Sequence, residues 1–252
     1  MWPSLLPGQW AWLGFCASWP TSAESVVRRD KKTGRLRPPL SALTFQRLII
    51  EWYSKCGDKW LPWRRTDDPW AIIVAAFLLR KTTVKQVLRV YEDFLQRFPS
   101  PETLLSTSVN NIEEMLRPLG IEHQRARNLK DLAEHIVKKF SGKIPCDKEK
   151  LKELPGVGDY IVSEVLLCAC NRPVPLLDRN MIRVIERVFG IRSARERPHL
   201  DKMMWSFAEL LVPKDPQQAK DFNFGVLDLA RKICTARKPK CGECPLRGIC
   251  RH

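Results

Sequence analysis

Four cysteines close to the end of the chain constrain its fold more than any other feature of the sequence. They follow the spacing C-x6-C-x2-C-x5-C and are Cys234, Cys241, Cys244 and Cys250. This spacing lets four thiolates converge on one centre within a short loop, and four cysteine ligands suit either tetrahedral zinc or an iron–sulfur cluster. Cysteines that serve as metal ligands favour a reducing compartment. The other cysteines are therefore interpreted as thiols of the tail or the core, namely Cys16, Cys56, Cys146, Cys168 and Cys170.

Elsewhere in the chain, apolar residues recur at helical spacing. Phe45, Leu48 and Ile49 are one example, and no strand-like alternation of useful length occurs, so we predict an all-α fold. The run 70–79 has no polar side chain, and because it is too short to span a bilayer it is expected to be a central buried helix. Further helices are expected at 102–107, 111–117, 124–139, 148–153, 159–169, 180–188, 199–212 and 221–233.

The charge of the chain suits a partner coated in phosphates. Its 43 Lys and Arg residues outnumber 28 Asp and Glu residues, for a formal net charge of +15. An anionic membrane surface would attract such a chain too, but Pro3, Pro7 and Pro20 interrupt any spanning helix in the uncharged segment 1–23, and a basic signal region is absent there. No membrane partner is expected. Residues 1–40 are interpreted as a tail, disordered or linker-like, or as the product of a wrongly chosen start codon, and no role is assigned to them.

A Pro-Gly-x-Gly turn is predicted to join two helices in the middle of the chain. Asp147 is a suitable N-cap for a helix over 148–153, and a second helix is expected from Asp159. Between them, Gly156 and Gly158 leave the backbone N–H groups at the start of the second helix uncovered, and such groups bind phosphate well. Glycine also permits a positive φ and the close approach of another backbone. The alternative is an ordinary turn that uses Pro and Gly for geometry alone.

Asp178 follows the hairpin and precedes the amphipathic helix expected over 180–188. Asp is a favoured N-cap and stabilises a helix by about 1 kcal/mol, so capping alone would explain this residue. Its context favours a second role. The segment 154–184 resembles the helix-hairpin-helix DNA glycosylase superfamily, which includes endonuclease III and the adenine glycosylases, and by this resemblance Asp178 is catalytic.

The resemblance extends over about residues 43–251 and implies an architecture of two helical lobes. One is a six-helix barrel domain with the hairpin, over 69–172, and the other is a terminal domain with the cluster loop, built from 41–68 plus 173–252. The cysteine spacing is similar to that of endonuclease III, which implies a 4Fe-4S cluster rather than zinc. Double-stranded DNA is expected to lie across the cleft between the lobes, bound by a monomer that acts in the cytoplasm on the nucleoid.

The resemblance also implies the reaction, that of a DNA glycosylase in base excision repair. Breaking an N-glycosidic bond builds positive charge on the sugar, and Asp178 can either stabilise this charge or deprotonate an attacking water. In the superfamily, a lysine two residues after the last hairpin glycine can form a Schiff base and cut the strand. Tyr160 occupies that position and predicts a monofunctional enzyme that leaves an abasic site, although another lysine could supply weak lyase activity. Packing at the start of a helix is the alternative role for Tyr160.

Residues of the buried helix indicate which base is removed. Ala76 stands where the adenine glycosylases place a catalytic Glu, and the sequence ends at His252, where those enzymes carry a further domain that reads oxidised guanine. The segment 78–83, together with Tyr160 and Asp178, instead resembles the mismatch-specific thymine glycosylases. The expected substrate is thymine or uracil mispaired with guanine. An adenine or oxidised-pyrimidine glycosylase with lyase activity, and a non-catalytic DNA-binding module, are the alternatives.

An enzyme of this class has to flip the base out of the duplex and fill the gap. Arg80 or Lys81 falls where the family plugs the void, and Ile121 falls where it wedges an apolar side chain. Favourable charge at a helix C-terminus and a core position beyond a turn are the respective alternatives. The segment between the first two cluster cysteines carries three cations, Arg237, Lys238 and Lys240. They are expected to bind DNA phosphates. The alternative is that they form a solvated charged face.

Overall fold

The computed structural model describes residues 28–29, 36–37 and 39–252, and their regular secondary structure is helical apart from one short strand pair. β1 (Arg28–Arg29) and β2 (Leu36–Arg37) pair in antiparallel orientation. Strands of two residues are too short for an alternating sequence pattern to reveal them. The predicted all-α fold is otherwise confirmed, and most of the tail predicted over residues 1–40 lies outside the described residues.

Helices make up the rest of the described chain and are joined by turns in which Pro and Gly recur. The predicted helices are present with shifted ends, the largest shift being at the last long helix, whose first turn is polar and begins at Pro216 instead of residue 221. In chain order the helices are α1 (Ala42–Cys56), η2 (Pro62–Arg64), α2 (Pro69–Leu78), α3 (Val84–Leu88), α4 (Tyr91–Arg97), α5 (Pro101–Ser106), α6 (Val109–Leu116), η3 (Arg117–Leu119), α7 (Glu122–Phe140), α8 (Lys148–Lys152), α9 (Asp159–Cys168), α10 (Arg179–Phe189), η4 (Pro198–Leu200), α11 (Lys202–Leu211), α12 (Pro216–Lys232) and η5 (Cys241–Glu243).

The expected central buried helix is α2. Asp68 caps its N-terminus by accepting hydrogen bonds from the backbone N–H groups of Trp70 and Ala71, and Pro69 occupies its first position. Every residue from Trp70 to Leu78 is buried, and α2 packs against α4, α7 and α9. In the described residues, no helix is both long enough and apolar enough to cross a membrane.

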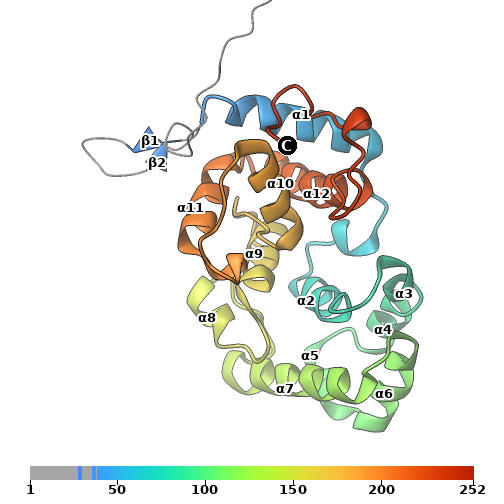
Figure 1. Cartoon of the computed structure of the whole chain (residues 1–252). Helices are drawn as coiled ribbons and strands as arrows, with labels where there is room; N and C mark the ends of the chain where they lie inside the picture. Colours follow the sequence, from blue (N-terminus) through green and yellow to red (C-terminus); the bar gives the residue numbers. More distant parts are fainter. Residues whose placement is uncertain (1–27, 30–35, 38) are drawn as a thin grey trace, which may run out of the picture.

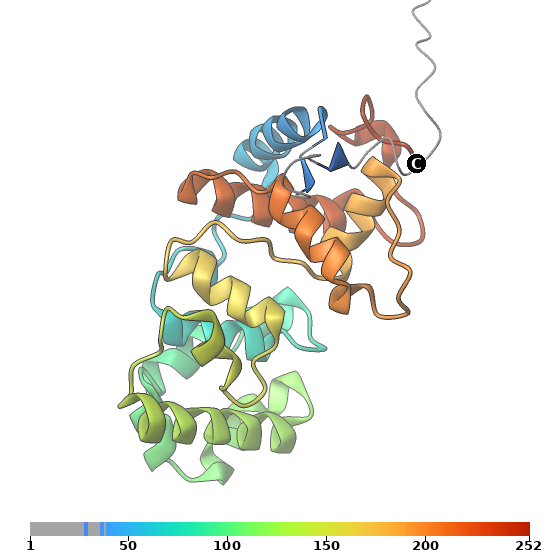
Figure 2. The same ribbon diagram turned by 90° about the vertical axis from the view of Figure 1, so that its left-hand side faces the viewer.

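Helices from opposite ends of the sequence pack together. α1 lies along α12 and contacts α11, while α10 contacts α12 (Figure 1). Phe45 of α1 meets Phe189 and Phe222 edge-on, at ring-centroid distances of 5.2 and 5.5 Å. Gly225 allows the close approach of α1 and α12, because a Cβ atom there would lie 2.7 Å from Ile49 Cγ2. Figure 2 shows these terminal helices above α2–α8, with α9 between the two groups.

Two cysteines that the sequence analysis treats as thiols form a disulfide instead. Cys146 precedes α8 and Cys170 follows α9, and they are bonded with a Cα–Cα distance of 5.7 Å, within the usual range for disulfides. The thiol assignment is wrong for this pair because α8 packs against α9 and the residues that flank the two helices come together. Cys56 and Cys168 are free thiols, and Cys16 lies outside the described residues.

Candidate active site

The hairpin between α8 and α9 presents uncovered backbone amides. Asp147 caps α8 by accepting a hydrogen bond from Lys150 N, as expected. Gly156 has φ of +73°, a conformation that favours glycine. Gly158 begins α9 without a side-chain cap, and a Cβ atom there would meet nothing within 4 Å. The first amides of α9 therefore lie beside open space, where a phosphate can approach them.

Arg80 is bound to the hairpin. Its guanidinium donates a hydrogen bond to Gly156 O and lies 4.2 Å from the centre of the Phe77 ring. Burial lowers the pKa of this guanidinium, with a smaller effect from the charge of Arg125. Lys81, in contrast, is exposed and has φ of +53°. Of the two candidates for filling the gap in the duplex, Lys81 is the one whose side chain is free to reach DNA.

Arg125 was missed by the sequence analysis and organises the loop after α2. It is only 5% exposed. Its guanidinium donates hydrogen bonds to the carbonyls of Phe77 at 2.9 Å, Leu78 at 3.3 Å and Arg80 at 2.5 Å, and to Gly120 O at 3.0 Å. These bonds satisfy the last carbonyls of α2 and tie them to the loop before α7.

Ile121 stands at the start of α7 and is 55% exposed. The alternative of a core position is therefore wrong, because the turn at Gly120 carries the side chain out of the core. Ile121 also has φ of +48°, which is an outlier for a β-branched residue and costs of order 1–3 kcal/mol. An exposed apolar side chain on a strained backbone fits a contact with a ligand better than a packing role.

Asp178 is a helix cap that also lines a hollow. Its Oδ1 accepts hydrogen bonds from Asn180 N and Met181 N, both at 2.8 Å, and its Oδ2 accepts one from Asn180 Nδ2 at 2.6 Å. It therefore caps α10. The same carboxylate lines a hollow of about 410 Å³, and burial raises its pKa despite these hydrogen bonds and the charge of Arg183.

Tyr160 lines this hollow together with Asp178, so the structure brings the two predicted catalytic residues together. Burial, and to a lesser extent the carboxylates of Glu164 and Asp178, raise the pKa of its phenol well above the ordinary value. Tyr160 is therefore a neutral side chain at physiological pH. It can pack against a base or donate a hydrogen bond, but it cannot act as a nucleophilic amine.

An ion pair between η2 and α12 also lines the hollow. Arg64 Nη1 lies 2.7 Å from Asp228 Oδ2, and Nη2 lies 3.0 Å from Oδ1. Both side chains are nearly inaccessible to solvent, and Arg64 also lies 4.6 Å from the centre of the Phe224 ring. Because such a bidentate pair has a defined geometry, it fixes this part of the wall of the hollow.

Glu164 also lines the hollow and was missed by the sequence analysis. It is 6% exposed, and its Oε2 is buried without a hydrogen-bond partner. The signal for it was present in the sequence, because Glu164 is the only charged residue between Tyr160 and Cys170. A carboxyl group in the middle of the largely apolar stretch from Ile161 to Cys168 needs a specific explanation.

The four cluster cysteines surround one small cavity. Within the described residues, no group of three or more His, Cys, Asp or Glu side chains is placed to hold a single metal ion. Thiols arranged around a space suit a multi-iron cluster better than one zinc ion. Arg187 of α10 donates a hydrogen bond to Cys234 Sγ at 3.3 Å, and Arg183 donates to Cys234 O at 2.8 Å. Such cations and donors suit thiolates that carry an anionic cluster.

The predicted phosphate-gripping residues lie on the same loop. Thr235 Oγ1 donates a hydrogen bond to Lys238 O at 2.7 Å, which closes the turn. The three side chains point into solvent from positions between the first two cluster cysteines, and all are exposed: Arg237, Lys238 and Lys240. None of the three lines the hollow with Asp178, although Thr235 and Ala236 of the same loop do.

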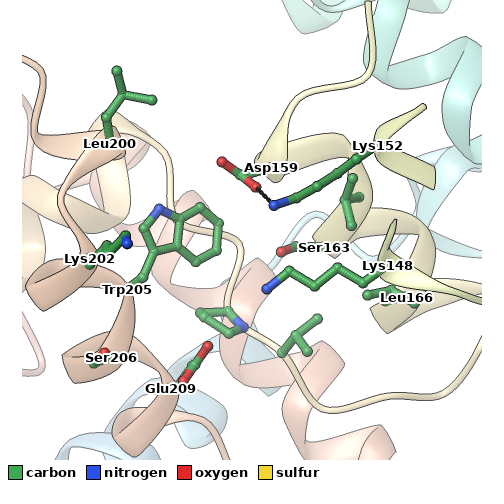
Figure 3. A pocket seen from close by; sticks show the side chains of 13 residues that line it. Lys148, Lys152, Asp159, Ser163, Leu166, Leu200, Lys202, Trp205, Ser206 and Glu209 are labelled. Atoms are coloured by element: carbon green, nitrogen blue, oxygen red, sulfur yellow. Dashed lines mark ion pairs between the residues drawn. The ribbon is translucent and has the colours of Figure 1, made fainter. Parts of the chain in front are cut away.

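A second hollow lies among α8, α9 and α11 and contains neither predicted catalytic residue. Figure 3 shows Lys148 and Lys152 on one side of it and Trp205 on the other. Lys152 Nζ is 3.0 Å from Asp159 Oδ1, and the indole N–H of Trp205 donates to a backbone carbonyl at 2.8 Å. Because neither Asp178 nor Tyr160 lines it, we do not include this hollow in the candidate site.

Comparison with known families gives two matches. Residues 74–210 match the HhH-GPD superfamily base excision DNA repair protein, and residues 234–250 match the iron-sulfur binding domain of endonuclease III. The first match contains the hairpin, Tyr160, Glu164 and Asp178. The second contains all four cluster cysteines and confirms the predicted iron–sulfur cofactor.

Individual relatives share most of their length with this chain. A thymine-DNA glycosylase of Aeropyrum pernix is 66% identical over 205 residues, which are 81% of this chain and 92% of the relative. A thymine/uracil-DNA glycosylase of Pyrobaculum aerophilum is 62% identical over 202 residues, which are 80% of this chain and 88% of the relative. The solved structure of a thermostable thymine-DNA glycosylase is 33% identical, with a TM-score of 0.78, over 83% of this chain and 95% of that chain.

Proposed function

The chain belongs to the HhH-GPD superfamily of base excision DNA repair proteins, and on that basis we propose that it is a monofunctional DNA glycosylase. It binds double-stranded DNA, removes thymine or uracil mispaired with guanine, and leaves an abasic site. The hollow shared by Asp178 and Tyr160 carries this proposal, and the names of the two similar glycosylases support the choice of base.

Asp178 is the proposed catalytic residue. Its two oxygens are held by three donors from the first turn of α10, so the carboxylate faces the hollow in a fixed orientation. As the C1′–N1 bond of the nucleotide breaks, an ionised Asp178 stabilises the positive charge on the sugar or takes a proton from the attacking water. Because burial raises its pKa, base release should fall as the pH is lowered through that raised pKa.

Tyr160 is proposed to make the enzyme monofunctional. A phenol cannot form the Schiff base through which a lysine cuts the strand. The neutral ring of Tyr160 instead closes the hollow beside Asp178. The product is therefore an intact strand with an abasic site.

The proposed DNA contacts lie on three loops. The amides of Gly158 and the following residues bind a phosphate, Lys81 and Ile121 enter the duplex where the base has been flipped out, and the cations of the cluster loop bind flanking phosphates. The exposed position and left-handed backbone of Lys81 and Ile121 support this assignment. Arg80 supports the hairpin instead of entering DNA.

We extend the proposal to the arrangement of the whole molecule. The region 69–172 forms the domain with the hairpin, and 41–68 plus 173–252 form the terminal domain that contributes Asp178 and the iron–sulfur cluster. The cluster fixes the loop that carries Arg237, Lys238 and Lys240. The protein acts as a monomer, in the cytoplasm, on the DNA of the nucleoid.

Replacing Asp178 by Asn tests the function. Asn keeps the capping geometry but cannot be ionised, so single-turnover release of thymine from a G·T duplex should fall at least about 100-fold while duplex binding survives. Asp215→Asn is the matched control, because Asp215 caps α12 by accepting from Gln218 N, away from the hollow. Unchanged release by Asp178→Asn would refute the assignment.

A panel of duplexes separates the proposed function from its rivals. Labelled strands with T, U, A or an oxidised pyrimidine opposite each partner base are incubated with the protein and analysed with and without alkali. A monofunctional enzyme gives strand breaks only after alkali. Breaks without alkali would indicate a lyase, and tight binding without base release would indicate a non-catalytic DNA-binding module.

A further inference from the structure

We propose that Glu164 is a second functional carboxyl group of this site and that, in its protonated form, it donates a hydrogen bond to a carbonyl oxygen of the flipped pyrimidine. This inference rests on the proposed glycosylase function. It assigns the residue that stabilises the departing base, whereas Asp178 acts on the sugar.

The position of Glu164 favours contact with a base. It follows Tyr160 by one helical turn, so the two side chains share a face of α9. Both line the hollow that contains Asp178. Among the described residues, no hydrogen bond or ion pair reaches the Glu164 carboxyl, and Oε2 is fully buried. A buried polar atom without a partner costs about as much free energy as a lost hydrogen bond, so a ligand that completes it would be favoured.

The surroundings of Glu164 do not neutralise its charge. The titratable and charged groups around it come from several elements and are Arg64 of η2, Tyr91 of α4, Tyr160 and Cys168 of α9, and Asp178 before α10. Arg183 of α10, and Asp228 and Arg231 of α12, line the same hollow. Both terminal nitrogens of Arg64 are bonded to Asp228, and its Nε is buried without a partner. Among the described residues, no cation is hydrogen-bonded or ion-paired to the Glu164 carboxyl.

The carboxyl group is thus a proton donor at neutral pH. Burial raises the pKa of Glu164 to about 8, with a further contribution from the charge of Asp178 and an opposing one from Arg64. Asp178 and Glu164 are two acids in one hollow whose different environments favour different protonation states, an arrangement that enzymes use to divide acid and base roles. Asp178 accepts three hydrogen bonds that stabilise its ionised form, and Glu164 accepts none.

The chemistry of base release needs such a donor. When the C1′–N1 bond breaks, its electron pair stays with the base, and the negative charge spreads onto the carbonyl oxygens of the pyrimidine. A hydrogen bond from the neutral Glu164 carboxyl strengthens as this charge develops. Water oxygen then bonds to C1′, and its proton passes to the Asp178 carboxylate. Glu164 retains its own proton, so the step needs no further reactant.

The test measures single-turnover release of uracil from a G·U duplex between about pH 5.5 and 9.5 for the wild type, Glu164→Gln and Glu164→Ala. Gln keeps a neutral donor, so Glu164→Gln should stay within a few-fold of the wild type, whereas Glu164→Ala should be at least about tenfold slower. The wild-type rate should fall as the pH rises through about 8, and this fall should be absent in Glu164→Gln. Equal loss in both variants, or no loss in Glu164→Ala, would overturn the proposal.

A change of leaving group separates base stabilisation from a structural role. In 5-fluorouracil the fluorine already stabilises the anion of the base, so Glu164→Ala should lose less activity on this base than on uracil. A variant that was merely misfolded would lose the same factor on both. Glu209→Ala serves as the control, since Glu209 is exposed and lines only the second hollow.

The pH dependence of thermal stability reports on the Glu164 proton independently of activity. In the folded protein Glu164 keeps its proton up to about pH 8, but in the unfolded chain it ionises near the ordinary 4.5; the Tm of the wild type should therefore fall relative to Glu164→Gln as the pH rises across this window. A wild type that releases no pyrimidine opposite guanine would overturn the proposed function together with this inference. An active wild type and an equally active Glu164→Ala would overturn this inference alone.

Discussion

Replacing Arg125 by Ala should unfold the loop that places Lys81 and Ile121. Arg125 is 5% exposed and donates hydrogen bonds to carbonyls at the end of α2 and to Gly120 O. Thr82 Oγ1 also donates to Leu78 O and Arg80 O, but among the described residues Arg125 is the only side chain that donates to Phe77 O or Gly120 O, so the variant removes that support from both. Arg127→Ala is a matched control, because Arg127 lies on the same helix, is exposed and forms no hydrogen bond or ion pair with the described residues.

The size of the effect follows from the number and kind of these bonds. Hydrogen bonds to a charged group contribute about 1.5–3 kcal/mol each, so four at the lower end give about 6 kcal/mol. The desolvation that lowers the pKa of Arg125 offsets part of this gain. We expect a loss of about 3–5 kcal/mol in the free energy of unfolding, comparable to removing one partner of a buried ion pair. The Tm should fall by roughly 10 °C.

Thermal unfolding followed by circular dichroism at about 222 nm measures this loss. Binding of a duplex that contains a stable abasic analogue should also weaken at least about tenfold for Arg125→Ala, since the loop no longer holds Lys81 and Ile121 in place. Arg127→Ala should change the free energy of unfolding by less than about 0.5 kcal/mol. If Arg125→Ala and Arg127→Ala had the same Tm, the reasoning would be refuted.

Three other predictions concern the hairpin, the disulfide and the cluster. Cys146→Ser should lower the free energy of unfolding by about 3 kcal/mol in guanidinium titrations, because it opens a cross-link between residues 24 positions apart; Cys56→Ser, at a free exposed thiol, should not. Gly158→Val should leave the Tm unchanged, since its Cβ meets nothing, and weaken duplex binding about tenfold by covering the first amides of α9. Cys244→Ser should remove the absorbance near about 400 nm and the bound iron, and retention of both would contradict the cluster assignment.

The sequence predicted the features that depend on local pattern or on fixed spacing. Helical periodicity and the turn at Gly156 define α8 and α9, and Asp147 and Asp178 are caps because Asp favours that position. The cysteine spacing predicted the metal site because the four ligands lie within one short segment of the chain. Each of these inferences needs only residues that are close together in the chain, or the resemblance of such a segment to a known family.

The features that the sequence analysis missed depend on contacts between distant segments. Arg125 lies on the same helical stripe as the buried Leu129 and Leu132, so its burial could have been noticed, but its carbonyl partners lie 45 to 48 residues earlier. The Cys146–Cys170 disulfide depends on how α8 packs against α9. The raised pKa of Glu164 depends on a hollow whose walls come from several helices. Such properties follow from tertiary packing and not from periodicity.

The pairing of α1 with α12 has a consequence for the synthesis of this protein. Asp58, just after α1, accepts a hydrogen bond from Lys232 and donates one from its backbone N–H to Asp228, 170 positions later. During translation α1 leaves the ribosome before the other described helices, but its apolar face, including Phe45 and Ile49, is not fully covered until α10, α11 and α12 have been made. The region around α2 and α9 can collapse earlier, since its contacts span shorter separations. The terminal lobe, with Asp178 correctly placed and the cysteine loop ready for iron, is therefore the last part of the molecule to form, and the enzyme gains its activity only when its two ends meet.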